Sequence, residues 1–207
     1  MKNTYAEFAT DRIILETYFP NKTGIMVEVG CADPTIYSMS KLFREHGWRC
    51  IGIEANPFFI DKQKAEGNEV YQYAVSTENK KDVDFFIVND YGDGHQMTFE
   101  SFSALKIHEG YIEKHSMPQN IQTIKVETKR LEDILKKNAK VKEIDLLSVD
   151  VEGHELDVIN SIDLKKFRPS VIVLENYLYD ENYNAVMLEK GYLLIQKVEY
   201  NYIYGRL

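Results

Sequence analysis

Residues 27–33 read Val27-Glu28-Val29-Gly30-Cys31-Ala32-Asp33, and this stretch indicates the class of fold. It closes the apolar run 25–29, which is short and rich in β-branched residues, as buried strands are. Gly30 allows the chain to turn tightly out of such a strand and to approach a ligand closely. Glu28 adds acceptor oxygens at the same point. The stretch therefore predicts a buried strand that ends in a ligand-binding turn.

Predicted strands and helices alternate outward from this turn. The strands are expected at 49–53, 69–75, 84–88, 121–127, 144–149 and 171–174, and the helices at 4–19, 38–46, 57–66, 131–138, 154–161 and 182–190. Such alternation is typical of βαβ units and a mainly parallel sheet. The closing segments 192–197 and 200–204 predict an antiparallel hairpin. Ligands of such sheets bind at the carboxyl ends of the strands, where the strand order reverses.

Length and charge narrow the class of protein. The 207 residues fit a single domain, 1–207, with a helical segment at 1–24 and a polar stretch at 90–120 that suits a lid or substrate loop. A net charge of −8 argues against a nucleic-acid partner. No apolar run approaches the ~20 residues that span a bilayer. We therefore expect a cytoplasmic protein that binds neither nucleic acid nor membrane.

An acid also ends the second predicted strand. Glu54 at this point can accept hydrogen bonds from both hydroxyls of a ribose, or it is an acid that a helix N-terminus favours. A dinucleotide site would need glycines where Ala32 and Thr35 stand, so a site without a pyrophosphate fits better. Ala74 and Val75 end the third predicted strand and form an adenine slot or ordinary strand packing.

Three acids and a histidine follow the strand predicted at 144–149. Because acids are rarely buried without a partner, such a cluster at a sheet edge indicates ligand, metal or proton traffic. His154 is the candidate base, since its usual pKa lies near neutrality, and Asp150 and Glu152 are further catalytic candidates. The alternatives are that Asp150 caps a helix while Glu152 and Glu155 face solvent, and that His154 lies on an exposed helix turn.

Two polar residues end the next predicted strand. Glu175 and Asn176 follow it directly, so their oxygens and those of Asp150 are expected in one crevice. Three such oxygens suit Mg²⁺. The alternative is that they bind the substrate by hydrogen bonds without a metal.

Together these segments resemble the FkbM family of S-adenosylmethionine-dependent methyltransferases. The resemblance spans about residues 5–176 and is carried by Phe8-Ala9-Thr10-Asp11-Arg12, residues 27–33, Gly47-Trp48, Ile53-Glu54-Ala55-Asn56-Pro57, Tyr73-Ala74-Val75-Ser76 and Leu147-Ser148-Val149-Asp150-Val151-Glu152-Gly153-His154-Glu155. It implies a class I, three-layer αβα Rossmann-like fold, with a seven-stranded, mainly parallel sheet and an antiparallel C-terminal hairpin. It also implies O-methylation of a hydroxyl on a small molecule or saccharide.

The resemblance further implies which residues hold the cofactor. It puts Glu28, Gly30 and Asp33 around the methionine part of S-adenosylmethionine, Glu54 on the ribose, and Ala74 and Val75 near the adenine. The expected cofactor set is completed by Cys31, Ala32, Ser38, Ala55 and Asp150. Pro34 follows Asp33 where relatives commonly carry glycine, so we expect a different loop shape.

Two other functions remain open at this stage. A nicotinamide-dependent oxidoreductase would have a similar sheet and ribose acid, although the missing glycines count against it. A methyltransferase fold can also serve as a binding module without catalysis. The alternating Tyr200, Tyr202 and Tyr204 share one strand face, which favours core packing or a homodimer surface over sugar stacking.

Overall fold

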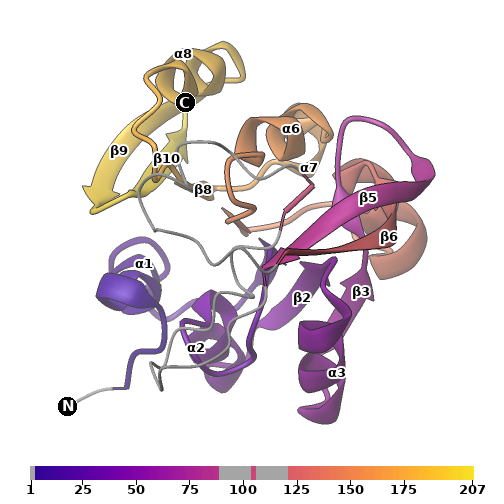
Figure 1. The fold of residues 1–207 in the computed structure, drawn as a ribbon. Coiled ribbons are helices and arrows are strands. Elements are labelled where there is room, and N and C mark those ends of the chain that lie inside the picture. Colours follow the sequence, from indigo (N-terminus) through magenta and orange to yellow (C-terminus); the bar gives the residue numbers. More distant parts are fainter. Residues whose placement is uncertain (1–2, 89–103, 106–120) are drawn as a thin grey trace.

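The computed structural model describes residues 3–88, 104–105 and 121–207, so the predicted lid or substrate loop lies outside them except at Ala104 and Leu105. Its main sheet has seven strands in the order β3-β2-β1-β7-β8-β10-β9 (Figure 1). The strands are β1 (Ile25–Val29), β2 (Arg49–Glu54), β3 (Glu69–Gln72), β7 (Leu146–Val149), β8 (Val171–Glu175), β9 (Tyr192–Val198) and β10 (Asn201–Arg206). All pairs are parallel except those of β10, which runs antiparallel to β8 and β9. The predicted sheet is confirmed.

Helices cover both faces of this sheet (Figure 1). On one face, α1 (Thr10–Tyr18) and α2 (Met39–Glu45) enclose a core that includes Ile14, Phe43 and Trp48. The opposite face is covered by α5 (Leu131–Asp133), the π-helical turn η3 (Ile134–Ala139), α6 (Glu155–Asn160), α7 (Leu164–Phe167) and α8 (Asn182–Glu189). A further helix, α3 (Pro57–Ala65), packs against β2 and β3. These are the three layers that the sequence predicts.

A second, three-stranded sheet has the order β4-β6-β5. It contains β4 (Ala74–Val75), β5 (Lys80–Val88) and β6 (Ile121–Lys129). The single strand predicted at 69–75 is therefore wrong: it is two strands in two sheets. The Tyr73 N–H donates the last hydrogen bond to β2, to the Glu54 carbonyl oxygen (3.0 Å), and Ala74 and Val75 then pair with β6 instead.

The predicted N-terminal helix starts later than expected. A short 3-10 turn, η1 (Glu7–Ala9), precedes α1, and the left-handed φ angles of Phe8 (54°) and Ala9 (57°) separate the two. Asp11 is fully buried, and its carboxylate accepts a hydrogen bond from the Tyr5 N–H (2.8 Å). This bond folds the upstream chain back onto α1.

The strand order reverses at β1, which lies between β2 on one side and β7 on the other. A crevice is expected at the carboxyl ends of these strands. Across the described ranges, no helix is both long and apolar enough to cross a membrane.

Candidate functional site

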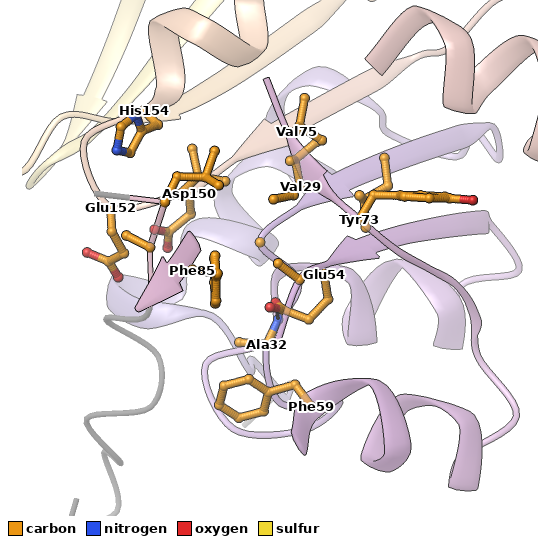
Figure 2. Close-up of a pocket in the computed structure, with 17 residues that line it drawn as sticks. Val29, Ala32, Glu54, Phe59, Tyr73, Val75, Phe85, Asp150, Glu152 and His154 are labelled. Carbon is orange, nitrogen blue, oxygen red and sulfur yellow. Dashed lines mark hydrogen bonds between the residues drawn. The ribbon is translucent and has the colours of Figure 1, made fainter. Parts of the chain in front are cut away.

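Two adjoining cavities lie at this reversal of strand order. The first encloses about 650 Å³ of empty space, and Figure 2 shows Glu54 and Phe59 on one side of it and Asp150 and Glu152 on the other. The second encloses about 1440 Å³. Both are lined by Gly30, Ala32, Phe59, Asp150 and Glu152, so they meet at the ends of β1 and β7. The arrangement provides room for two ligands, or two parts of one ligand, that touch near Asp150.

Gly30 makes the turn between the cavities. Its φ is +80°, a conformation that favours glycine, and its N–H donates to the Ile53 carbonyl oxygen (2.8 Å). A Cβ at this position would lie 1.7 Å from the Asp150 carbonyl oxygen. The sequence suggests that Gly30 allows the backbone to approach a ligand closely. In the structure its close neighbour is the backbone of Asp150, directly after β7.

Glu54 ties the second strand to this turn. One carboxylate oxygen accepts from the Ala32 N–H (3.0 Å) and the other from the Asn56 N–H (2.8 Å). Burial raises the pKa of the Glu54 carboxyl, which the two N–H groups partly offset. Each carboxylate oxygen retains a second lone pair, and the side chain lines the first cavity. Glu54 can therefore organise the turn and still accept hydrogen bonds from a ligand.

An apolar wall faces Glu54 across the first cavity. The lining includes Ala55, which follows β2, and the predicted pair Ala74 and Val75. Phe85 of β5 and Tyr73 complete this wall (Figure 2). Small and flat apolar surfaces of this kind suit a planar base, and the place of Ala74 and Val75 beside an adenine stays a prediction.

Glu28 is a buried acid in the wall of the second cavity. It is 5% exposed, and its Oε1 accepts from the Met39 N–H (3.1 Å). Within the described residues its Oε2 has no hydrogen-bond partner. Burial raises the pKa of this carboxyl to about 7. An unsatisfied buried acceptor is costly, so a donor from a bound ligand would be stabilising here.

The other residues of the turn have defined partners. Burial opposes ionisation of Asp33, but the hydrogen bond from Lys62 (2.8 Å) and two backbone N–H groups lower its pKa. Cys31 also lines the second cavity, and burial raises the pKa of its thiol. Ser38 is buried and caps α2 by accepting from the Lys41 N–H (3.2 Å). Neither cavity is lined by Ser38, so its role as a cofactor ligand stays a prediction.

The predicted catalytic candidates lie around the junction of the cavities (Figure 2). Asp150 and Glu152 line both cavities, whereas His154 lines the first. The Nδ1 atom of His154 lies 3.3 Å from the Asp157 carboxylate. His154 is thus partly exposed and does not line the second cavity. Of the three candidates, Asp150 and Glu152 line both cavities.

Asp150 and Glu175 form a pair of acids that share a hydrogen bond. Solvent reaches Asp150 through the cavity, yet protein atoms surround it. This burial, together with the charge of Glu155, raises the Asp150 pKa to about 7. Burial and the nearby Asp150 raise the pKa of Glu175 well above its usual range. The pair can therefore hold a proton near neutral pH and exchange it with a ligand.

The predicted metal ligands are only partly brought together. Carboxylate oxygens of Asp150, Glu155 and Glu175 lie within 4.8 Å of one another. The Asn176 amide donates to the Asp180 carbonyl oxygen (3.0 Å) and accepts from the Asp180 N–H (2.8 Å), so the structure does not support its predicted role as a ligand. Glu155 is committed as well, because its oxygens accept from Val151, Gly153 and Tyr183.

Residues that the sequence did not single out complete the second cavity. Glu7 and Tyr177 line it, and Tyr200 donates a hydrogen bond to the Glu7 carboxylate. Tyr202 and Tyr204 are buried in the core, which confirms the core interpretation for these two. Tyr200 differs because it lies in the turn before β10, beside the carboxyl end of β8. The position of Tyr200 at the start of the closing segment 200–204 was the signal in the sequence from which its place beside the site could have been inferred.

Comparisons with known proteins gave a family match and similar solved structures. The model of the methyltransferase FkbM domain matches residues 28–202. One similar solved structure is a putative RNA methyltransferase, PH1948, from Pyrococcus horikoshii, with 8% identity, a TM-score of 0.48, and 97% of this chain and 81% of that chain covered. Another is precorrin-6y C5,15-methyltransferase from Geobacter metallireducens GS-15, with 13% identity, a TM-score of 0.49, and 99% and 93% covered. A comparison with curated protein sequences gave no match.

Proposed function

The chain belongs to the FkbM methyltransferase domain family, and on that premise we propose that it methylates a hydroxyl oxygen of a small molecule or sugar. Methyl transfer and the use of S-adenosylmethionine follow from the family. One observation carries the rest of the proposal: the two cavities meet at Asp150, whose carboxyl has a pKa of about 7. A group with that pKa can accept the proton that a hydroxyl loses when it is methylated.

The residues around the first cavity fit S-adenosylmethionine. Glu54 would accept hydrogen bonds from the ribose hydroxyls, and the wall of Ala74, Val75 and Phe85 would hold the adenine. The methionine part would extend into the second cavity, where the unsatisfied Oε2 of Glu28 would accept a hydrogen bond from its ammonium, so the acceptor would occupy the rest of that cavity. When bound, the cofactor supplies a methyl group on a positively charged sulfur.

The second cavity suits the acceptor. Asp150 lies where the second cavity meets the first, so its carboxylate can contact an acceptor hydroxyl that is placed next to the methyl group of the cofactor. Holding the two reactants together lowers the barrier without further chemistry. Asp150 then accepts the hydroxyl proton. Glu175 already shares a hydrogen bond with Asp150, so the two carboxyls titrate as a pair and share the change in charge.

No step in this mechanism passes through a metal ion. Of the three predicted ligands, Asn176 holds the Asp180 backbone, and the acid that joins Asp150 and Glu175 is Glu155, whose oxygens already accept three hydrogen bonds. Because Asn176 and Glu155 are engaged in this way, we assign no metal ion to the mechanism.

Calorimetry and product analysis test the proposal. Titration with S-adenosylmethionine should give a saturable heat, and an absence of heat at millimolar cofactor would overturn the assignment of the first cavity. Acceptors from a panel of sugars and small alcohols should then gain a methyl ether, identified by NMR of the product. A methyl group found on nitrogen or carbon instead would contradict the proposed reaction. The Asp150→Asn variant is the matched control, because it keeps the shape of the side chain but removes the base.

A further inference from the structure

The acceptor side of the second cavity is partly built by the N-terminal segment Tyr5–Ala9. Ala6 and Glu7 line the cavity, although they precede the part of the chain that the family model matches, residues 28–202. Two contacts fix the segment: Asp11 accepts from the Tyr5 N–H, and Glu7 accepts from the Tyr200 hydroxyl. The segment thus contributes to the acceptor side of the pocket from outside the matched residues.

An aromatic wall stands beside Glu7. Phe8 meets Tyr200 edge to face, with ring centroids 5.3 Å apart, and Tyr177 meets the same ring at 5.2 Å. These three rings come from the N-terminal segment, from the turn before β10 and from the loop after β8. Tyr177 and Tyr200 line the cavity. The faces of aromatic rings attract cations, especially where water is excluded.

The charged residues that line this cavity are mostly acids. The described residues that line it include six acids and one base: Glu7, Glu28, Asp33, Asp150, Glu152, Glu175 and Lys62. Lys62 is already paired with Asp33 at 2.8 Å. Glu28 faces the cofactor side and Glu175 shares a hydrogen bond with Asp150, so Glu7 remains on the acceptor side. Such a pocket repels phosphate and carboxylate groups and attracts a positive charge.

From the aromatic wall, the Glu7 carboxylate and the excess of acids, we infer that the acceptor is a hydroxylated amine, such as an amino sugar, whose ammonium group binds beside Glu7. This inference rests on the proposed function and adds the class of acceptor to it. The hydroxyl of the acceptor reaches Asp150, while the ammonium lies against Glu7 and the aromatic wall. Glu7 is then the residue that selects the acceptor, and Asp150 the residue that reacts with it.

Calorimetry with glucosamine and glucose tests the charge preference directly, because the two sugars share a ring and differ by an ammonium in place of a hydroxyl. The protein is first saturated with S-adenosylhomocysteine, and each sugar is titrated near pH 7. We expect glucosamine to bind at least about tenfold tighter than glucose, which corresponds to about 1.4 kcal/mol. Equal affinities, tighter binding of glucose, or binding of neither sugar would each overturn the inference.

The variant Glu7→Gln isolates the residue. Glutamine keeps an oxygen that accepts from the Tyr200 hydroxyl but removes the charge, so the preference for glucosamine should fall to less than about threefold. Glu189→Gln removes the same charge from an exposed position on α8 and should leave the preference intact. An undiminished preference in Glu7→Gln would refute the role of Glu7. If S-adenosylhomocysteine fails to bind, the proposed function fails, whereas the sugar titrations without cofactor still report on the amine preference.

Discussion

Replacing Glu54 with glutamine should weaken binding of S-adenosylmethionine by about tenfold to a hundredfold. Glutamine has the same shape as glutamate but offers one acceptor oxygen instead of two. In the wild-type protein both oxygens are used by the backbone, at 3.0 Å from Ala32 N and 2.8 Å from Asn56 N, and each keeps one lone pair for a ribose hydroxyl. The substitution therefore removes one hydrogen bond to the turn and one to the cofactor.

The magnitude follows from the charge of the carboxylate. A hydrogen bond to a charged group contributes about 1.5–3 kcal/mol, and about 1.4 kcal/mol corresponds to a tenfold change in affinity. The unpaired Ala32 N–H adds a second effect, since a buried donor without a partner costs about 1–3 kcal/mol of folding stability. Glu54→Ala removes both oxygens and should weaken cofactor binding by at least about tenfold as well.

Two measurements separate the direct effect from the effect on the turn. Calorimetry gives the Kd of S-adenosylmethionine, and urea denaturation gives the loss of stability. A double-mutant cycle with the two-prime-deoxy form of S-adenosylhomocysteine then isolates the ribose contact, because deleting that hydroxyl should cost affinity in the wild type and less in the variant. Glu66→Gln, at the exposed end of α3, is the charge-matched control. A wild-type Kd for Glu54→Gln would refute the ribose assignment.

Three further predictions concern the junction of the cavities. The rate of methyl transfer should rise as pH increases through about 7, because Asp150 acts only when ionised; Asp150→Asn should lower kcat by roughly 10²-fold or more and abolish this limb of the pH profile. Gly30→Ala should lower the urea midpoint and prevent cofactor binding, since its Cβ would lie 1.7 Å from the Asp150 carbonyl oxygen, and a normal midpoint would contradict this packing. Excess EDTA should leave the rate unchanged, because Asn176 and Glu155 already have protein partners, and a loss that Mg²⁺ restores would contradict the metal-free mechanism.

The sequence could predict the sheet because its signals are local. The apolar run before Gly30, the turn itself and the acid after the second strand each depend on a few neighbouring residues. Parallel strands then bring Glu54 and Asp150 to one edge without further information. The break at Tyr73 could not be predicted, because it depends on the pairing of Ala74 and Val75 with β6, a strand that lies far along the chain.

The second cavity was harder to predict because its walls are far apart in the sequence. Glu7 and Tyr200 are separated by 193 positions, and neither lies in a motif with a recognised chemistry. Phe8 was expected within a helix, yet its left-handed φ of 54° turns the ring toward Tyr200. Propensity alone cannot predict this conformation, which is uncommon for a bulky residue and is held by tertiary contacts.

The run Asp150–Glu155 shows how similar residues divide between chemistry and structure. Sequence reasoning treated its acids as one cluster, or left Glu155 in solvent. In the structure Glu155 is buried because its carboxylate accepts from two N–H groups of the run and from Tyr183. That anchoring holds a turn in which Glu152 adopts a left-handed φ of 60°. Together with burial, the charge of Glu155 raises the pKa of Asp150. Glu155 therefore positions and tunes Asp150, the acid that we propose as the base, which explains why carboxylates stand at both ends of the turn.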